Sequence, residues 1–332
     1  MNDYEVLIGD CRETLKTLPA QSINTCVTSP PYFGLRDYGH EGQMGAEPTP
    51  DDFVVALVEV FREVRRVLRD DGTVWLNIGD SYATGTKASR QPGNKSFGES
   101  TAKAQGVPRI GTPDGLKTKD LIGIPWRVAF ALQADGWYLR QDIIWHKPNP
   151  MPESVTDRCT KSHEYIFLLS KSPKYYYDHE AVKEPAVGGQ TGSAAKFKRS
   201  DSKRAQTIPG QAYGTHRDDR PDISYDADLR NRRSVWTVPT RPYKGAHFAT
   251  FPPALIEPCI LAGCPHGGAV LDPFGGSGTT AGVAVGSGRN AVICELNPEY
   301  VDLIAERVAT VSGAAIDQVA AKKQIDIFSE AV

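Results

Sequence analysis

The chain has no apolar run long enough to cross a membrane, and residues 1–5 lack the basic and apolar regions of a secretory signal. It also has no C-x-x-C pair, because its six cysteines are scattered. Cys259, Cys264 and His266 lack a fourth ligand at zinc-like spacing. These absences predict a cytoplasmic protein with reduced core thiols, no metal and no membrane partner.

The chain has little net charge, so its total charge gives no evidence for a polyanionic partner. Its 38 Lys and Arg nearly balance 40 Asp and Glu. The charge is segregated, however, because residues 183–244 hold 13 basic and 7 acidic residues, whereas residues 1–80 hold 7 basic and 14 acidic ones. A solvated loop gives the same excess, so it is the place of this segment between the two motifs described below that favours a nucleic-acid partner.

Strand and helix patterns alternate along most of the chain, which predicts a doubly wound α/β domain with a mostly parallel sheet. The expected strands are residues 4–9, 23–28, 73–78, 138–145, 164–169, 269–271 and 290–295. The expected helices are residues 11–18, 51–69, 121–134, 279–285 and 298–311. A turn is expected at residues 70–72, where Asp-Asp-Gly precedes a strand.

A glycine-rich segment follows the strand expected at residues 269–271. It reads Asp272-Pro273-Phe274-Gly275-Gly276-Ser277-Gly278-Thr279 and leads into a helix. Glycines without a Cβ let a ligand approach such a turn closely, and Glu295 ends the next strand, where a carboxylate commonly accepts ribose hydroxyl groups. The glycine pattern alone fits equally a dinucleotide-binding dehydrogenase or a tight structural turn.

A second motif, Thr28-Ser29-Pro30-Pro31-Tyr32, ends the strand expected at residues 23–28. The exocyclic amino group of cytosine or adenine is a poor nucleophile, because its lone pair is delocalised into the ring. The Ser29 hydroxyl and the Pro30 carbonyl, held by successive prolines, are suited to accept both amino hydrogens. Tyr32 offers a flat face on which an extruded base can stack. The nitrogen can then attack a methyl group directly, with no covalent enzyme intermediate.

Together the two motifs resemble those of the amino-methylating DNA methyltransferases in their beta-class order, with the catalytic motif before the cofactor motif. Residues 143–152 and 163–165 also resemble that family, so the resemblance covers most of residues 4–307. It implies a protein encoded by a prokaryote or by a phage and present in the cytoplasm of the host cell. It implies the Rossmann-like fold of S-adenosylmethionine-dependent methyltransferases in circularly permuted order. Members that act on cytosine N4 usually have Ser before Pro-Pro, as Ser29 is here, which favours cytosine N4 over the alternative, adenine N6.

The resemblance and the strand ends together assign the site residues. The expected catalytic residues are Ser29, Pro30, Pro31 and Tyr32. The expected cofactor-binding residues are Asp10, Thr28, Thr250, Phe251, Asp272, Phe274, Gly275, Gly276, Ser277, Gly278, Thr279 and Glu295. Asp10 is expected to reach the adenine of S-adenosylmethionine, and Asp272 and Phe274 its methionine part.

Double-stranded DNA is the expected partner, bound through basic side chains that contact phosphates or guanine edges. The expected DNA-binding residues are Lys196, Lys198, Arg199, Lys203, Arg204, Arg230, Arg232 and Arg233, with Trp145 and Lys147 at the rim of the base pocket. Trp145 is equally compatible with a place in the core. A cognate restriction endonuclease is a further expected partner, and the protein is expected to be a monomer or a homodimer. An NAD-dependent oxidoreductase and a DNA-binding module without turnover are the alternatives from other classes.

Two polar stretches divide the chain into six expected parts. The division, in chain order, is a catalytic half of the core at residues 1–82, a flexible basic insertion at 83–120, a continuation of the core at 121–182, a DNA target-recognition region at 183–244, a cofactor-binding half of the core at 245–312, and a C-terminal tail at 313–332.

Overall fold

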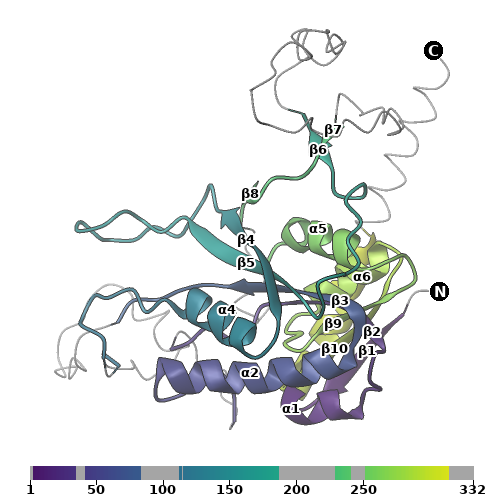
Figure 1. Cartoon of the computed structure of the whole chain (residues 1–332), viewed down its shortest axis with the longest axis horizontal. Coiled ribbons are helices and arrows are strands. Elements are labelled where there is room, and N and C mark those ends of the chain that lie inside the picture. Colours follow the sequence, from purple (N-terminus) through teal and green to yellow (C-terminus); the bar gives the residue numbers. More distant parts are fainter. Residues whose placement is uncertain are drawn as a thin grey trace, which may run out of the picture. The chain divides into compact units, whose positions relative to one another are not determined.

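The computed structural model describes residues 3–34, 42–83, 112–113, 115–186, 229–240 and 251–313. Its central feature is an eight-stranded sheet (Figure 1). The strands, in their order across the sheet, are β1 (Tyr4–Ile8), β10 (Asn290–Glu295), β9 (Ala269–Asp272), β2 (Ile23–Thr28), β3 (Leu68–Ile78), β5 (His163–Ser170), β4 (Tyr138–His146) and β8 (Val235–Thr237).

The sheet is mostly parallel and joins the two ends of the chain. The first five strands in this order run parallel, β5 runs antiparallel to β3 and β4, and β8 is parallel to β4. Strands β10 and β9, late in the sequence, are inserted between β1 and β2. This placement confirms the predicted Rossmann-like fold with circularly permuted order.

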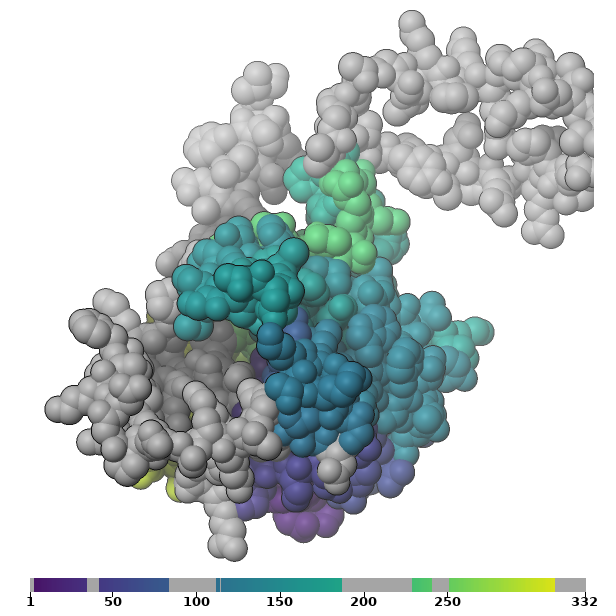
Figure 2. All heavy atoms as spheres, turned by 90° about the vertical axis from the view of Figure 1, so that its left-hand side faces the viewer, coloured from purple at the N-terminus to yellow at the C-terminus, as the bar shows by residue number. Residues whose placement is uncertain are grey.

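Helices cover both faces of the sheet, as the alternating sequence pattern predicts (Figure 1). On one face lie α1 (Cys11–Thr14), the 3-10 turn η1 (Leu15–Thr17), α2 (Pro50–Val67) and α4 (Ile124–Ala134); on the other lie α5 (Pro253–Gly263) and α6 (Thr279–Gly286). The 3-10 turn η3 (Pro298–Tyr300) leads into helical residues 301–313. In the space-filling view, the indigo atoms of α2 lie along the lower edge, below the blue residues that include α4 (Figure 2).

Helix α2 shows how local sequence builds this layer. Thr49 caps its first turn by accepting a hydrogen bond from the Asp52 amide at 3.1 Å, and proline at the first helical position has no amide hydrogen to leave unpaired. Phe53, Leu57 and Phe61 recur at helical spacing and are fully buried against the sheet. Burial of each such side chain contributes about 2 kcal/mol relative to exposure.

The structure departs from the predicted elements in several places, of which β3, α4 and β8 have a clear local cause. β3 begins at Leu68 rather than at Thr73, and residues 69–72 form a bulge, because Ile23 pairs with Leu68 whereas Thr25 pairs with Thr73. α4 begins at Ile124, since Gly123 adopts a left-handed conformation, with φ 79°, before it. Strand β8 was not predicted, because three residues carry too little periodicity.

Residues 179–233 form a second compact unit, of which the structure describes 179–186 and 229–233. Within it, β6 (Glu184–Pro185) and β7 (Leu229–Arg230) form an antiparallel pair, and Arg230 Nε lies 2.9 Å from Glu184 Oε1. Most of the predicted insertion at residues 83–120 lies outside the described residues, but its ends meet, because the Ala83 amide donates to the Asp120 carbonyl at 2.8 Å. The predicted tail at 313–332 lies outside them from residue 314 onward. The boundaries of the six parts stay predictions.

None of the helices in the described ranges combines the length and the hydropathy that crossing a membrane requires. All six cysteines are free thiols. Five are buried, as predicted for core thiols, whereas Cys159 is exposed. Cys259 lies in α5, where it is 1% exposed and directs its thiol toward the Leu255 carbonyl. Cys259 therefore lies in the core, as predicted for these thiols.

Candidate active site

The predicted catalytic and cofactor residues gather at one edge of the sheet. Strands β1, β10, β9 and β2 are parallel neighbours, so their carboxyl ends share that edge. Asp10, Glu295, Asp272 and Ser29 stand at or just after these four ends. In open α/β sheets, ligands bind outside the carboxyl ends of the strands. The tertiary structure thus brings together two motifs that lie far apart in the sequence.

Asp272 directly joins the two motifs. Its Oδ1 accepts hydrogen bonds from the Thr28 hydroxyl at 2.6 Å and from the Phe274 amide at 3.0 Å, and its Oδ2 accepts one from the Thr280 hydroxyl at 2.6 Å. The side chain is completely buried, and burial raises its pKa from 3.8 to about 6 despite these three donors. Thr28 and Asp272 therefore connect β2 to β9 from inside the protein.

Two glycines of the turn after β9 are required by packing. A Cβ at Gly275 would lie 2.9 Å from Ile293 Cβ, on the neighbouring strand β10. Gly278 precedes α6 with φ +81°, and a Cβ there would lie 2.9 Å from Ile304 Cγ2. The sequence suggested close approach of a ligand as the reason for these glycines. At these two positions the structure shows close approach of the protein itself, which fixes the path of the turn.

Glu295 and the turn hold each other in place. Its Oε2 accepts a hydrogen bond from the Gly276 amide at 2.8 Å, and its Oε1 accepts one from the Asn297 amide at 2.8 Å. Burial raises the pKa of this carboxyl, and the two amide donors partly oppose the rise. Each carboxylate oxygen retains a second lone pair, which is the chemistry that recognition of ribose hydroxyl groups needs.

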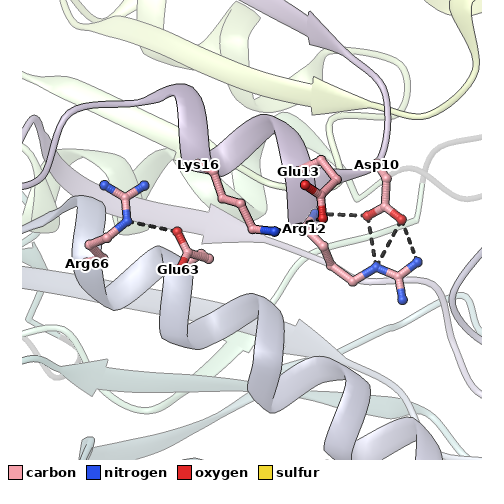
Figure 3. Close-up of polar contacts among 6 residues, drawn as sticks. All are labelled: Asp10, Arg12, Glu13, Lys16, Glu63 and Arg66. Atoms are coloured by element: carbon pink, nitrogen blue, oxygen red, sulfur yellow. Dashed lines mark hydrogen bonds and ion pairs between the residues drawn. The ribbon is translucent and has the colours of Figure 1, made fainter.

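Asp10, at the end of β1, already has a partner in the described structure. Its carboxylate accepts hydrogen bonds from the Arg12 amide at 2.8 Å and from Arg12 Nε at 2.9 Å (Figure 3). Arg12 holds the pKa of this carboxyl below its ordinary value. Asp10 also caps the short helix α1, so it is an ionised and oriented acceptor at the cofactor edge. Its predicted contact with adenine stays a prediction.

The catalytic motif leaves β2 at this same edge. Ser29 is half-buried and Pro30 is buried, immediately after the buried Thr28. The Tyr32 hydroxyl donates to Glu164 Oε2 at 2.7 Å and lies 3.4 Å from Asn77 Oδ1. Glu164 is the second residue of the antiparallel strand β5, which starts beside the end of β3, and this explains why residues 132 positions apart meet. The motif therefore contacts β3 and β5 through Tyr32 and β9 through Thr28.

Trp145 and Lys147 have different surroundings, although both were predicted at the rim of the base pocket. Trp145 is 4% exposed, and its indole NH donates to the Val238 carbonyl at 2.8 Å, which is the core environment that the sequence left open for it. Lys147 Nζ lies 4.2 Å from the centroid of that ring and forms an ion pair with Glu164. Lys147 thus contacts the carboxylate that accepts the Tyr32 hydroxyl proton.

The remaining predicted residues fall into three groups. Phe251 is buried just before α5, Phe274 is half-buried, and Ser277 and Thr279 are buried in the turn and at the start of α6. Arg230 and Arg233 both hydrogen-bond Glu184 Oε1 in the second unit, and Arg232 follows β7. Thr250, Lys196, Lys198, Arg199, Lys203 and Arg204 lie outside the described residues.

The sequence reasoning missed Asn77 and Gly79, and it gave Glu164 no role. Asn77 is a buried amide, 3% exposed, in the apolar strand β3, and its side chain donates to Glu164 and to the Tyr165 carbonyl. A polar residue inside a strand that otherwise reads as core was the available signal for Asn77. Contact between Glu164 and Tyr32 had no local signal.

The strand order and this edge define a class, the S-adenosylmethionine-dependent methyltransferases. The residues fit that cofactor, since the half-buried carboxylate of Asp10 and the buried carboxylate of Glu295, each oriented by hydrogen bonds, suit its hydroxyl groups and its positive charge. Residues 23–306 match the sequence model of the N6 and N4 DNA methylase family, and the chain belongs to this family of DNA methyltransferases. Its cofactor is therefore the methyl donor S-adenosylmethionine and not NAD.

Individual relatives support this assignment along nearly the whole chain. The type II methyltransferase M.SmaI of Serratia marcescens is 50% identical over 308 residues, which cover 93% of this chain and 91% of that protein. M.Cfr9I of Citrobacter freundii is 49% identical over 308 residues, covering 93% and 88%. In fold the chain is similar to the cytosine-N4-specific PvuII DNA methyltransferase, with a TM-score of 0.59, 18% identity, and coverage of 96% of this chain and 94% of that one.

Proposed function

We propose that this protein transfers a methyl group from S-adenosylmethionine to the exocyclic N4 of cytosine within a specific duplex DNA sequence. The observation that carries the proposal is Ser29, which stands directly before Pro30-Pro31 at the end of β2, beside the cofactor turn after β9. Three of the similar proteins agree with it. The relatives M.SmaI and M.Cfr9I are type II methyltransferases, and the structural neighbour PvuII methyltransferase is specific for cytosine N4.

The chain's own groups supply acceptors and a stacking surface. The Ser29 hydroxyl and the Pro30 carbonyl accept the two amino hydrogens of cytosine, which draws the nitrogen lone pair out of conjugation with the ring. Tyr32 stacks on the base once it has left the duplex. The bound cofactor supplies an activated methyl group. Because the amino nitrogen attacks it directly, no enzyme nucleophile is required, and the nitrogen releases one proton after transfer.

Target recognition is proposed for residues 183–244, whose excess of basic residues is suited to a polyanionic backbone. Arg230, Arg232 and Arg233 are the candidates within the described residues. A restriction endonuclease that cuts the same sequence is the proposed biological counterpart, since methylation of its target would protect the DNA. Co-expression of the chain should then make plasmid DNA resistant to an endonuclease of matching specificity.

The decisive experiment is mass spectrometry of nucleosides from mixed-sequence duplex DNA incubated with the purified protein and S-adenosylmethionine. The expected product is N4-methylcytosine, and a Tyr32→Ala variant prepared in parallel controls for contaminating methyltransferases. N6-methyladenine would refute the proposed base while retaining the mechanism. Absence of any modified base, with genomic DNA that offers all short sequences as substrate, would refute the proposed activity.

A further inference from the structure

We infer that Glu164, Asn77 and Gly79 form a socket that holds the Tyr32 ring ready for stacking before DNA arrives. The inference rests on the proposed function, because it concerns how the stacking residue of that reaction is oriented. Glu164 is a positioning residue in this view, since it acts on the base only through Tyr32. Lys147 in turn orients Glu164.

The polar side of the socket is a connected set of hydrogen bonds. Tyr32 donates its hydroxyl proton to Glu164 Oε2 at 2.7 Å, and the Asn77 side-chain amide donates to the same oxygen at 3.3 Å. Asn77 is itself fixed by a hydrogen bond to the Tyr165 carbonyl at 3.1 Å. The Glu164 side chain is 15% exposed, so water competes little for this carboxylate. A hydrogen bond from a phenol to a shielded carboxylate is among the stronger kinds in proteins.

The other side of the socket is steric and involves Gly79, which directly follows β3. A Cβ at this position would lie 2.5 Å from Tyr32 Cε2, 3.1 Å from Cδ2 and 3.2 Å from Cζ. The backbone of Gly79 is not in the left-handed region, so alanine is disfavoured there by the tyrosine ring alone. The ring is therefore confined at its edge by Gly79 and at its hydroxyl by Glu164.

Lys147 completes the arrangement from the end of β4. Its ammonium group forms an ion pair with the other oxygen of Glu164 and lies over the buried Trp145 ring. Each Glu164 oxygen thus has its own partner, which fixes the plane of the carboxylate. A ring held in this way has already lost the rotational freedom that stacking would otherwise remove, so binding of the base costs less entropy.

The test is a double-mutant cycle of Tyr32→Phe and Glu164→Ala, read as the single-turnover rate of methyl transfer. Each single variant should slow transfer about tenfold, the effect of one hydrogen bond to a charged group. The double variant should be slower than the worse single variant by no more than about twofold, since both changes remove one interaction. Glu164→Gln, whose amide oxygen still accepts the hydroxyl proton, should recover most of the rate lost in Glu164→Ala. The Kd of S-adenosylmethionine should stay within about twofold in all variants.

Gly79→Ala tests the steric side without removing any polar group. It should lower the methyl-transfer rate and reduce the fluorescence of a flipped cytosine analogue placed at the target position, with the cofactor Kd retained. Any of three results would overturn the socket. They are multiplicative losses of rate in the cycle, an equal rate in Glu164→Gln and Glu164→Ala, and an unchanged rate in Gly79→Ala. The same cycle measured by urea unfolding tests the Tyr32–Glu164 contact independently of activity. A wild-type protein without methyl transfer would instead refute the proposed function, and the unfolding cycle would still decide whether the socket exists.

Discussion

Replacing Asp272 by asparagine tests whether the buried carboxylate costs stability near neutral pH. Burial raises the pKa of Asp272 from 3.8 to about 6, so the folded protein holds this proton more tightly than the unfolded chain does. The protonated carboxyl of Asp272 therefore stabilises the folded protein. This stabilisation is fully present below about pH 4 and is lost as the pH rises through about 6. A shift of about two pKa units corresponds to about 3 kcal/mol of unfolding free energy. Asparagine has nearly the same shape and does not ionise.

The measurement is urea unfolding of the wild type and Asp272→Asn at several pH values from 4 to 7.5, without cofactor. The unfolding free energy of the wild type relative to the variant should fall by about 3 kcal/mol across this range. Asp10→Asn is the matched control of opposite sign. Because Arg12 lowers the pKa of Asp10 below its ordinary value of 3.8, the wild type should change little relative to this control variant across that range and should lose stability only as the pH falls below about 4. A difference between the wild type and Asp272→Asn that stays constant with pH would refute the reasoning.

Three further predictions follow from single contacts. Gly278 and Gly123 have nearly the same φ, +81° and +79°, but a Cβ at Gly278 would lie 2.9 Å from Ile304, whereas one at Gly123 has no neighbour within 4 Å. Gly278→Ala should therefore lower the free energy of urea unfolding by about 2 kcal/mol more than Gly123→Ala does. Equal losses would mean that the contact with Ile304 is unimportant. Ser29→Ala should lower kcat about tenfold or more and leave the calorimetric Kd of the cofactor within about twofold, whereas a larger change in Kd would contradict its catalytic role. Arg230→Ala should weaken duplex binding and reduce the salt slope, measured by fluorescence anisotropy, by about one unit, and an unchanged slope would exclude a phosphate contact.

Most of the fold could be predicted from the sequence because its signals are local. Strands β2 and β10 match their predicted bounds, and α2 begins one residue before its predicted start, since apolar spacing and a Thr-Pro cap act within a few residues. The bulge at residues 69–72 could not be predicted in this way. Asp-Asp-Gly reads locally as a turn, yet pairing of Leu68 with the neighbouring strand β2 extends β3 past it.

The two motifs were recognisable from the sequence because each is a contiguous run whose chemistry depends on its own residues. The motifs and their order indicated the expected class of protein, and the residue before Pro-Pro indicated the expected base. Only the tertiary structure decided what surrounds them. It buries Trp145, places Asp272 against Thr28, and brings Glu164 to the hydroxyl of Tyr32. Such contacts depend on strand order and on whether β5 runs parallel or antiparallel to β3, and a local pattern of residue types carries information on neither.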